Sequence, residues 1–159
     1  MPIKIITDKP QSVRKTVQIA IETDWKIIIE PPIFSVPLID DDIATVDPDN
    51  ITRELRGGQV FFSSPIIISN TSSSTAIVEV EMISEGSTIT TSLAPSILVP
   101  ANDSLILPPG IVLIKDDLDN PTVAGSLLRV KGSANNVLTL TTTVVEKEIG
   151  RHSPDTESI

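Results

Sequence analysis

The chain has 159 residues and a formal net charge of -9, and 40% of its residues are hydrophobic, enough for one domain with an apolar core. Only 3% are aromatic and none is cysteine, which excludes disulfides and cysteine-bound metals and leaves base stacking without support. The acidic charge repels phosphate backbones, and no stretch reaches the about 18 apolar residues of a membrane helix.

Residues 1–58 contain short strand-like runs. Val17, Ile19 and Ile21 alternate with polar or small residues, and this period of two predicts a strand with one buried face. Residues 25–30 predict a second strand. The Thr23-Asp24 step between the two predicts a tight turn, so we expect the pair to form a hairpin.

Prolines and acidic residues interrupt the rest of this region. Pro31 and Pro32 end the second strand, because proline cannot donate a hydrogen bond to a sheet. Residues 34–38 are extended again, and residues 40–50 are acidic and predict a loop. Residues 50–56 favour one helical turn, after which a Gly-Gly pair marks a boundary.

Residues 59–149 consist of runs of Ile, Val and Thr separated by Ser, Asn, Pro and Gly. These runs recur about every 8–12 residues, which is typical of an antiparallel sandwich. Runs 27–29 and 66–68 are continuously aliphatic, so we expect them to be buried on both faces, by the core or by a partner. The predicted strands are residues 59–62, 66–68, 76–83, 88–93, 97–99, 104–107, 111–114, 127–131 and 137–149.

The one histidine, His152, gives no support for catalysis. It lies beside Ser153 and Asp155, which together have the composition of a catalytic triad. A triad needs a rigid scaffold that holds each group within hydrogen-bond reach, and the polar tail 150–159 offers none. We therefore expect no enzymatic activity and no cofactor.

Two acidic clusters are the candidates for metal binding. Asp116, Asp117 and Asp119 form one, and residues 40–42 form the other. Calcium binds several carboxylate and carbonyl oxygens at once, but neither cluster has the spacing of an EF-hand. We therefore interpret both as solvated charge runs in loops and expect no bound metal.

The order of several motifs resembles a β-sandwich module of structural proteins of tailed bacteriophages. This family is not enzymatic, and its members decorate capsids or form neck, tail or fibre parts. The resemblance implies that Pro100-Ala101-Asn102 turns the chain between sheets and that Ala134-Asn135-Asn136 closes the last hairpin. The chain departs from the family in the longer stretch 115–125. The motifs are residues 66–70 (IIISN), 76–80 (AIVEV), 97–105 (ILVPANDSL), 110–113 (GIVL) and 128–137 (LRVKGSANNV).

The sequence therefore predicts an all-β, antiparallel β-sandwich, Ig-like or jelly-roll-like, with an extended N-terminal β-arm. Residues 1–58 are expected to form the arm, residues 59–149 the sandwich and residues 150–159 a polar tail. The resemblance implies a non-enzymatic structural component of a bacteriophage virion, either a capsid decoration protein or a neck or tail accessory protein. The alternative is a ligand- or glycan-binding module of a fibre or surface protein, which would show an exposed aromatic residue or clustered carboxylates at a loop end.

The expected partners are further copies of the chain and other virion proteins, with no nucleic acid, membrane or small-molecule substrate. Ile27, Ile28, Ile29 and Phe34 are the predicted partner contacts, because prolines limit how far the arm can bury its own apolar side chains. The first apolar run, residues 3–6, is too short for a signal peptide. We therefore expect synthesis in the host cytoplasm and localisation in the virion.

Overall fold

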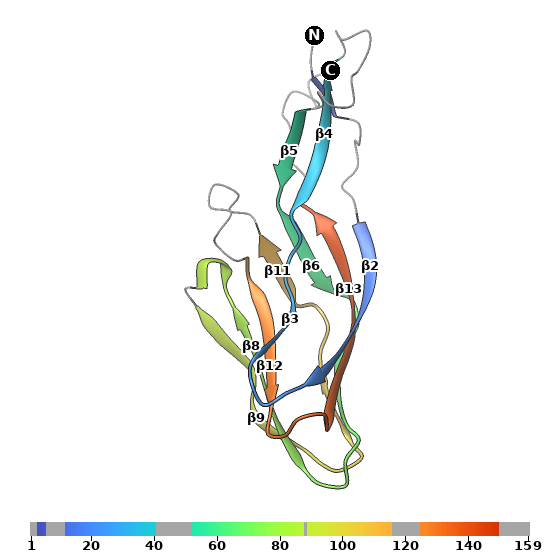
Figure 1. Cartoon of the computed structure of the whole chain (residues 1–159), viewed down its shortest axis with the longest axis vertical. Coiled ribbons are helices and arrows are strands. Elements are labelled where there is room, and N and C mark those ends of the chain that lie inside the picture. Colours follow the sequence, from blue (N-terminus) through green and yellow to red (C-terminus); the bar gives the residue numbers. More distant parts are fainter. Residues whose placement is uncertain (1–2, 6–11, 41–51, 88, 116–124, 150–159) are drawn as a thin grey trace.

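The computed structural model describes residues 3–5, 12–40, 52–87, 89–115 and 125–149 (Figure 1). Within these residues every regular element is a β-strand, apart from one 3-10 turn at Glu85–Ser87. All strand pairs are antiparallel, and two of the sheets enclose an aliphatic core. The predicted all-β antiparallel sandwich is confirmed.

The first sheet is organised around the long strand β13. On one side β13 pairs with β2 over residues 138–147. On its other side it pairs first with β7 and then with β6, so β6 and β7 act as one broken strand. In the same way β10 pairs with β7, and β11 with β6. The strands of this sheet are β2 (Ser12–Ile21), β6 (Gly58–Phe62), β7 (Ile66–Asn70), β10 (Ser104–Leu107), β11 (Val112–Lys115) and β13 (Leu138–Glu148).

Hydroxyl side chains close the break between β6 and β7. The Ser63 and Thr143 backbones are joined by an N–H···O bond of 3.0 Å, and the Thr143 N–H donates to Ser64 Oγ at 2.8 Å. These bonds keep β13 paired where Pro65 cannot donate. The sequence 63–65 therefore bends the strand without separating it from its neighbour.

The second sheet has the order β3–β12–β8–β9. Its strand β9 carries register shifts opposite Val80, close to Pro95 and to Ser96, whose φ is 52°. Two strands predicted separately, on either side of Pro95, are thus one bulged edge strand. The strands of this sheet are β3 (Lys26–Ile29), β8 (Ala76–Ile83), β9 (Thr90–Val99) and β12 (Leu127–Gly132).

The two sheets together form a jelly roll. With each broken strand counted once, the orders are β2–β13–β6/β7–β10/β11 and β3–β12–β8–β9. The chain passes from one sheet to the other at every connection within the sandwich except β8–β9. Two four-stranded sheets wound in this way are the double Greek key of jelly rolls. Of the two predicted architectures, the topology fits the jelly roll.

Three local predictions are wrong, two of them because strand partners are not neighbours in sequence. The Thr23-Asp24 turn does not make a hairpin, since β2 and β3 lie in different sheets. The Ala134–Asn136 turn likewise leads from β12 in one sheet to β13 in the other, although the turn at Pro100–Asn102 between sheets is confirmed. The expected helical turn at residues 50–56 is instead β5 (Thr52–Arg56), which pairs with β4.

The core between the sheets is aliphatic, as the composition predicts. The continuous runs are buried on one face only: Ile66 and Ile68 are buried, whereas Ile67 between them is exposed. The core of this chain therefore covers only the inner face of each run, and the cover of the outer face by a partner stays a prediction. The largest fully buried apolar side chains are Ile21, Val60, Phe62, Ile66, Ile68, Val78, Leu113, Leu128, Leu138 and Leu140.

A third, smaller sheet extends from one end of the sandwich (Figure 1). It consists of β1 (Ile3–Ile5), β4 (Phe34–Asp40) and β5, in the order β1–β4–β5. β4 follows β3 along the chain and β5 leads into β6, so the β4–β5 hairpin prolongs strands of the sandwich. Only part of residues 1–58 is therefore an arm, because β2 and β3 complete the two sandwich sheets.

Candidate interaction surfaces

The residues with predicted chemistry lie mostly outside the described part of the chain. This holds for His152 and for Asp116, Asp117 and Asp119. Among the described residues no group of three or more His, Cys, Asp or Glu side chains could hold a metal ion. The same residues include no helix long and apolar enough to cross a membrane.

The predicted partner contacts Ile27, Ile28 and Ile29 lie on the edge strand β3 of the second sheet. Ile28 is 6% exposed and belongs to the core of its own chain, whereas Ile27 is 47% exposed. Ile29 and Phe34 are half-buried. Ile28 therefore makes its contacts within the chain, and Ile27 is the member of the set that presents its side chain to the outside.

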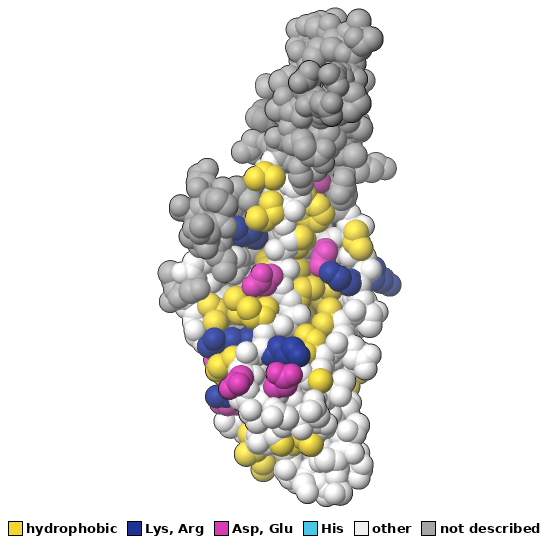
Figure 2. All heavy atoms as spheres, viewed as in Figure 1, with side chains coloured by type: hydrophobic (Ala, Val, Ile, Leu, Met, Phe, Trp, Pro, Cys, Tyr) yellow, Lys and Arg dark blue, Asp and Glu magenta, His cyan; other side chains and the backbone are white. Residues whose placement is uncertain are grey.

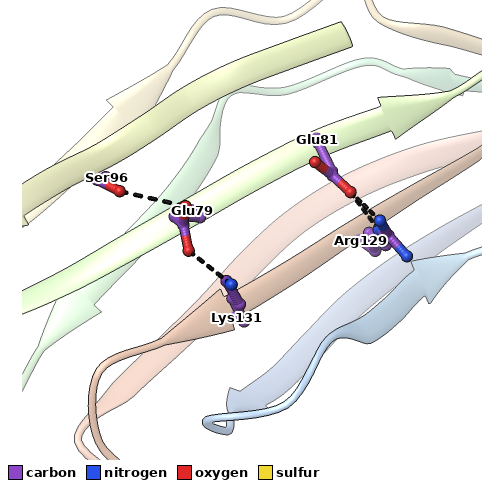
Figure 3. Close-up of polar contacts among 5 residues, drawn as sticks. All are labelled: Glu79, Glu81, Ser96, Arg129 and Lys131. Atoms are coloured by element: carbon purple, nitrogen blue, oxygen red, sulfur yellow. Dashed lines mark hydrogen bonds and ion pairs between the residues drawn. The ribbon is translucent and has the colours of Figure 1, made fainter. Parts of the chain in front are cut away.

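The outer side of the second sheet carries paired charges; we call it the outer β12 face. Figure 2 shows acidic and basic side chains next to one another over the lower part of the described sandwich. In Figure 3 Glu79 and Glu81 project from β8 towards Lys131 and Arg129 of β12. Lys131 Nζ lies 3.0 Å from Glu79 Oε2, and Arg129 forms an ion pair and a hydrogen bond with Glu81.

These cross-strand pairs follow from the register, which places Glu81 opposite Arg129 and Glu79 opposite Lys131. The hydrogen bond from Lys131 lowers the pKa of Glu79 below its ordinary value, and a second bond from Ser96 Oγ acts in the same direction. Opposite charges therefore balance one another along this face.

Trp25 adds to this face at the turn before β3. The Arg129 guanidinium carbon lies 4.5 Å from the centre of its ring, and Lys131 Nζ lies 4.8 Å from it. Both cations are already paired with carboxylates of β8. The ring thus takes part in a structural cation–π cluster that fixes β3 to β12.

The outer side of the first sheet is different, and we call it the outer β13 face. The registers place Phe61 in one row with Val112 and Val145, and Ile67 in another with Ile106 and Thr141. Arg14 and Lys147 are its only charged members. The face comprises Ser12, Arg14, Thr16, Gln18, Ala20, Gln59, Phe61, Ile67, Ser69, Ser104, Ile106, Val112, Ile114, Thr139, Thr141, Thr143, Val145 and Lys147.

Sequence reasoning missed this face, although part of the signal was visible. The alternation of Thr139, Thr141, Thr143 and Val145 along β13 shows that one side of this strand has no acidic residue. Which strands lie beside it depends on long-range pairing, and that pairing brings Phe61 and Ile67 onto the same surface. A wide surface without carboxylates is unusual for a chain of net charge -9.

The base of the β4–β5 hairpin is fixed by a buried ion pair. Arg56 Nη1 lies 2.5 Å from Glu148 Oε1, and both side chains are buried. The Ile149 N–H donates to the Gly57 carbonyl at 2.9 Å. At Gly58 a Cβ atom would lie 2.1 Å from the Pro32 carbonyl oxygen, so only glycine fits there. The base of the hairpin is thus joined to the end of β13 and packs closely against the segment that contains Pro32.

A small apolar hollow lies beside the break between β10 and β11. Its volume is about 320 Å³, and its lining residues come from β9, β10 and the connection to β11. The lining contains no ionisable side chain, so the hollow offers shape but no catalytic group. It is lined by Leu93, Leu107, Pro108, Pro109, Gly110 and Ile111.

Comparisons with known proteins give no family. No family model matches the chain, and no curated protein matches it. Among solved structures, the T13 particle of infectious bursal disease virus is similar at 12% identity and a TM-score of 0.42, covering 89% of this chain and 31% of that chain.

Two further structures of infectious bursal disease virus are similar to the same degree. The Gx strain gives 13% identity and a TM-score of 0.41, covering 93% of this chain and 35% of that one. The VP2 subviral particle gives 10% identity and a TM-score of 0.44, covering 89% and 33%. The chain spans about a third of these proteins. With TM-scores below 0.5, these likenesses carry no argument about function.

Proposed function

We propose that this chain is a non-enzymatic structural component of a virus particle, and specifically a capsid decoration protein or a neck or tail accessory protein of a tailed bacteriophage. In this proposal it is located in the virion and assembles through contacts with further copies and with other virion proteins. The order of short motifs from residue 66 to residue 137 supports the bacteriophage assignment.

The observation that carries the proposal is the outer β13 face. A sheet that is buried on its inner side carries Phe61, Ile67, Ile106 and Val112 exposed on its outer side. Exposed apolar surface of this kind typically marks a protein contact. Jelly rolls occur in viral capsids, and also in lectins and cupins. The surface, together with the fold, favours the role in assembly.

The alternative glycan-binding function receives less support from the site. Of the four aromatic side chains only Phe61 is exposed, and it lies on the flat face of a sheet rather than at a loop end. Trp25 is half-buried beneath two cations. Sugar binding by stacking would require an accessible ring in a shaped site.

The proposal is tested by mass spectrometry of particles purified from the source of the sequence. We expect the chain in mature particles at a fixed ratio to the major capsid or tail protein, and immunogold labelling should place it on the head, neck or tail. If the chain is absent from mature particles but present in the lysate, the proposed function is wrong.

A second test concerns the hairpin β4–β5, which we propose reaches a neighbouring subunit. Phe34 lies directly opposite Arg56 across the hairpin, so residues 35–55 can be replaced by a two-residue Asn-Gly turn. Because Arg56 and Glu148 remain, the shortened sandwich should still fold. We expect it to be lost from particles, whereas incorporation at the level of the full chain would show that the hairpin is not the connector.

A further inference from the structure

The outer β13 face lacks carboxylates even though the chain is strongly acidic. Arg14 and Lys147 lie near one end of the sheet, since their partners Val145 and Ser12 belong to the last rows of the register. The remaining members are Ser, Thr, Gln and apolar residues. The cores of protein interfaces are depleted in charge in the same way and enriched in aromatic residues.

We infer that this face binds a second copy of this chain, sheet face against sheet face. The inference rests on the proposed function and names one partner and the surface that it covers. Two copies with a net charge of -9 repel each other. The outer β13 face is a surface on which they can meet without placing one carboxylate against another.

The geometry of the face also suits a symmetric pair. A two-fold axis that runs across the strands reverses their direction, so Arg14 and Lys147 of one copy lie at the opposite end from those of the other. The Phe61 row of one copy then lies against the Ile67 row of the other, and the row of Thr143 lies at the two-fold axis. Two sheets can pack in this manner at about 10 Å, with their outward side chains interdigitating.

The area is sufficient for a specific dimer. Four strands about 4.8 Å apart, together with the length of β13 at about 3.3 Å per residue, give a face of about 600 Å². Two such faces bury about 1,200 Å² in total, which is the lower limit for stable, specific interfaces. A contact of this size forms reversibly and depends strongly on its central apolar side chains.

The outer β12 face provides a matched control. Ile67 and Ile106 form a cross-strand pair on the outer β13 face and are 39% and 62% exposed. Ile77 and Leu98 form the corresponding pair on the outer β12 face and are also 39% and 62% exposed. Substitution of the more exposed member in each pair changes the same amount of apolar surface on opposite sides of the molecule.

The test is sedimentation velocity of the purified full chain over a range of concentrations. We expect a dimer that Ile106→Asp weakens by at least about a hundredfold, because a carboxylate is then buried without a partner. Leu98→Asp should leave the dimer unchanged. Far-UV circular dichroism confirms that each variant is folded, and Val112→Asp replaces Ile106→Asp if the latter is not.

Two further measurements report on the geometry and the charge. The chain has no cysteine, so Thr143→Cys, in the row at the two-fold axis, should allow a short thiol-reactive cross-linker to join two copies, whereas Ile77→Cys should not. Added salt should strengthen the dimer, because it screens the repulsion of the two acidic chains over about 10 Å at 0.1 M. An association that weakens with salt would contradict the argument from charge.

The outcomes separate this inference from the proposed function. If the full chain is monomeric at every concentration, or if Leu98→Asp weakens the dimer as much as Ile106→Asp, then the outer β13 face does not bind a second copy. A monomeric chain that is nevertheless present in mature particles would leave the proposed function intact and assign the face to a different virion protein. A chain that dimerises through this face but is absent from mature particles would support the inference about the face and contradict the proposed function.

Discussion

Replacement of Asn70 by alanine should cost more stability than any other single change in a turn of the sandwich. Asn70 is buried at the end of β7, and all of its amide hydrogen-bonding capacity is used. Its Nδ2 donates to the carbonyl oxygens of Ser74 at 2.8 Å and Val99 at 2.9 Å. Its Oδ1 accepts from the Ser72 N–H and hydroxyl at 3.0 and 2.8 Å.

The size of the effect follows from these four bonds. They join the end of β7 in the first sheet to the turn that follows it and to the end of β9 in the second sheet, so their loss affects both sheets. A buried group that loses its partner costs about 1–3 kcal/mol, whereas the Ser72 groups are nearer the surface and can turn to water. We expect Asn70→Ala to lower the free energy of unfolding by about 3 kcal/mol and the Tm by about 6–12 °C.

Urea denaturation, followed by circular dichroism, measures this difference directly. The matched control is Asn135→Ala, because Asn135 accepts one exposed bond, from the Thr23 N–H at 2.9 Å. The control should lose less than about 1 kcal/mol. Equal losses for the two variants, or a loss below about 1 kcal/mol for Asn70→Ala, would refute the assignment of Asn70 as the residue that joins the sheets.

Three other perturbations test separate parts of the structure. Glu148→Gln should destabilise the chain by about 3–5 kcal/mol, because the Arg56 charge stays buried without its carboxylate, and the double change Arg56→Met with Glu148→Leu should cost less in urea denaturation. Glu79 should titrate, by NMR, below the ordinary range of glutamate, and Lys131→Met should raise that pKa. Because the folded-state pKa of Glu79 is lowered, the stability from this pair is present above the unfolded pKa and is lost as the pH falls through the folded pKa. A loss of stability in Lys131→Met that occurs only at acid pH would therefore contradict the assignment. The fragment 59–149 should fail to fold while 12–149 folds, since removal of β2 and β3 uncovers β13 and the core residues Ile21 and Ile28; a cooperative melt of the shorter fragment would show otherwise.

Element positions could be predicted from the sequence because their signal is local. The predicted strands 76–83 and 104–107 coincide with β8 and β10, and the long final strand is β13. In β13 the alternation of apolar and polar side chains at residues 138–141 indicates which residues face the core, whereas residues 105–107 of β10 are all apolar and give no such indication. Turn residues were equally informative at Asn102 and Asn136, whose φ values of 55° and 61° are left-handed.

Strand partners could not be predicted, because pairing in a jelly roll is mostly non-local. β13 pairs with β2, which precedes it by more than a hundred residues, and no feature of either strand identifies the other. The same limit explains why Ile28 was expected at a partner and is found in the core. It also explains the ion pair of Arg56 with Glu148, since neither residue carries a local signal for a partner 92 positions away.

The contrast between the two outer faces separates a contact surface from a merely solvated one. Threonine fits an exposed strand whether or not anything covers it, so the row along β13 is neutral evidence. Exposed apolar pairs do not separate the two faces either, because Ile77 and Leu98 of the outer β12 face are as exposed as Ile67 and Ile106. The distinguishing feature of the outer β13 face is that its apolar side chains lie among no carboxylates. Composition does not force the absence of carboxylates from this face, because Glu146 and Glu148 lie on the same strand and point to its other side. The outer β12 face shows what this chain does with a solvated sheet, where Glu79 and Glu81 are balanced by cations of the next strand.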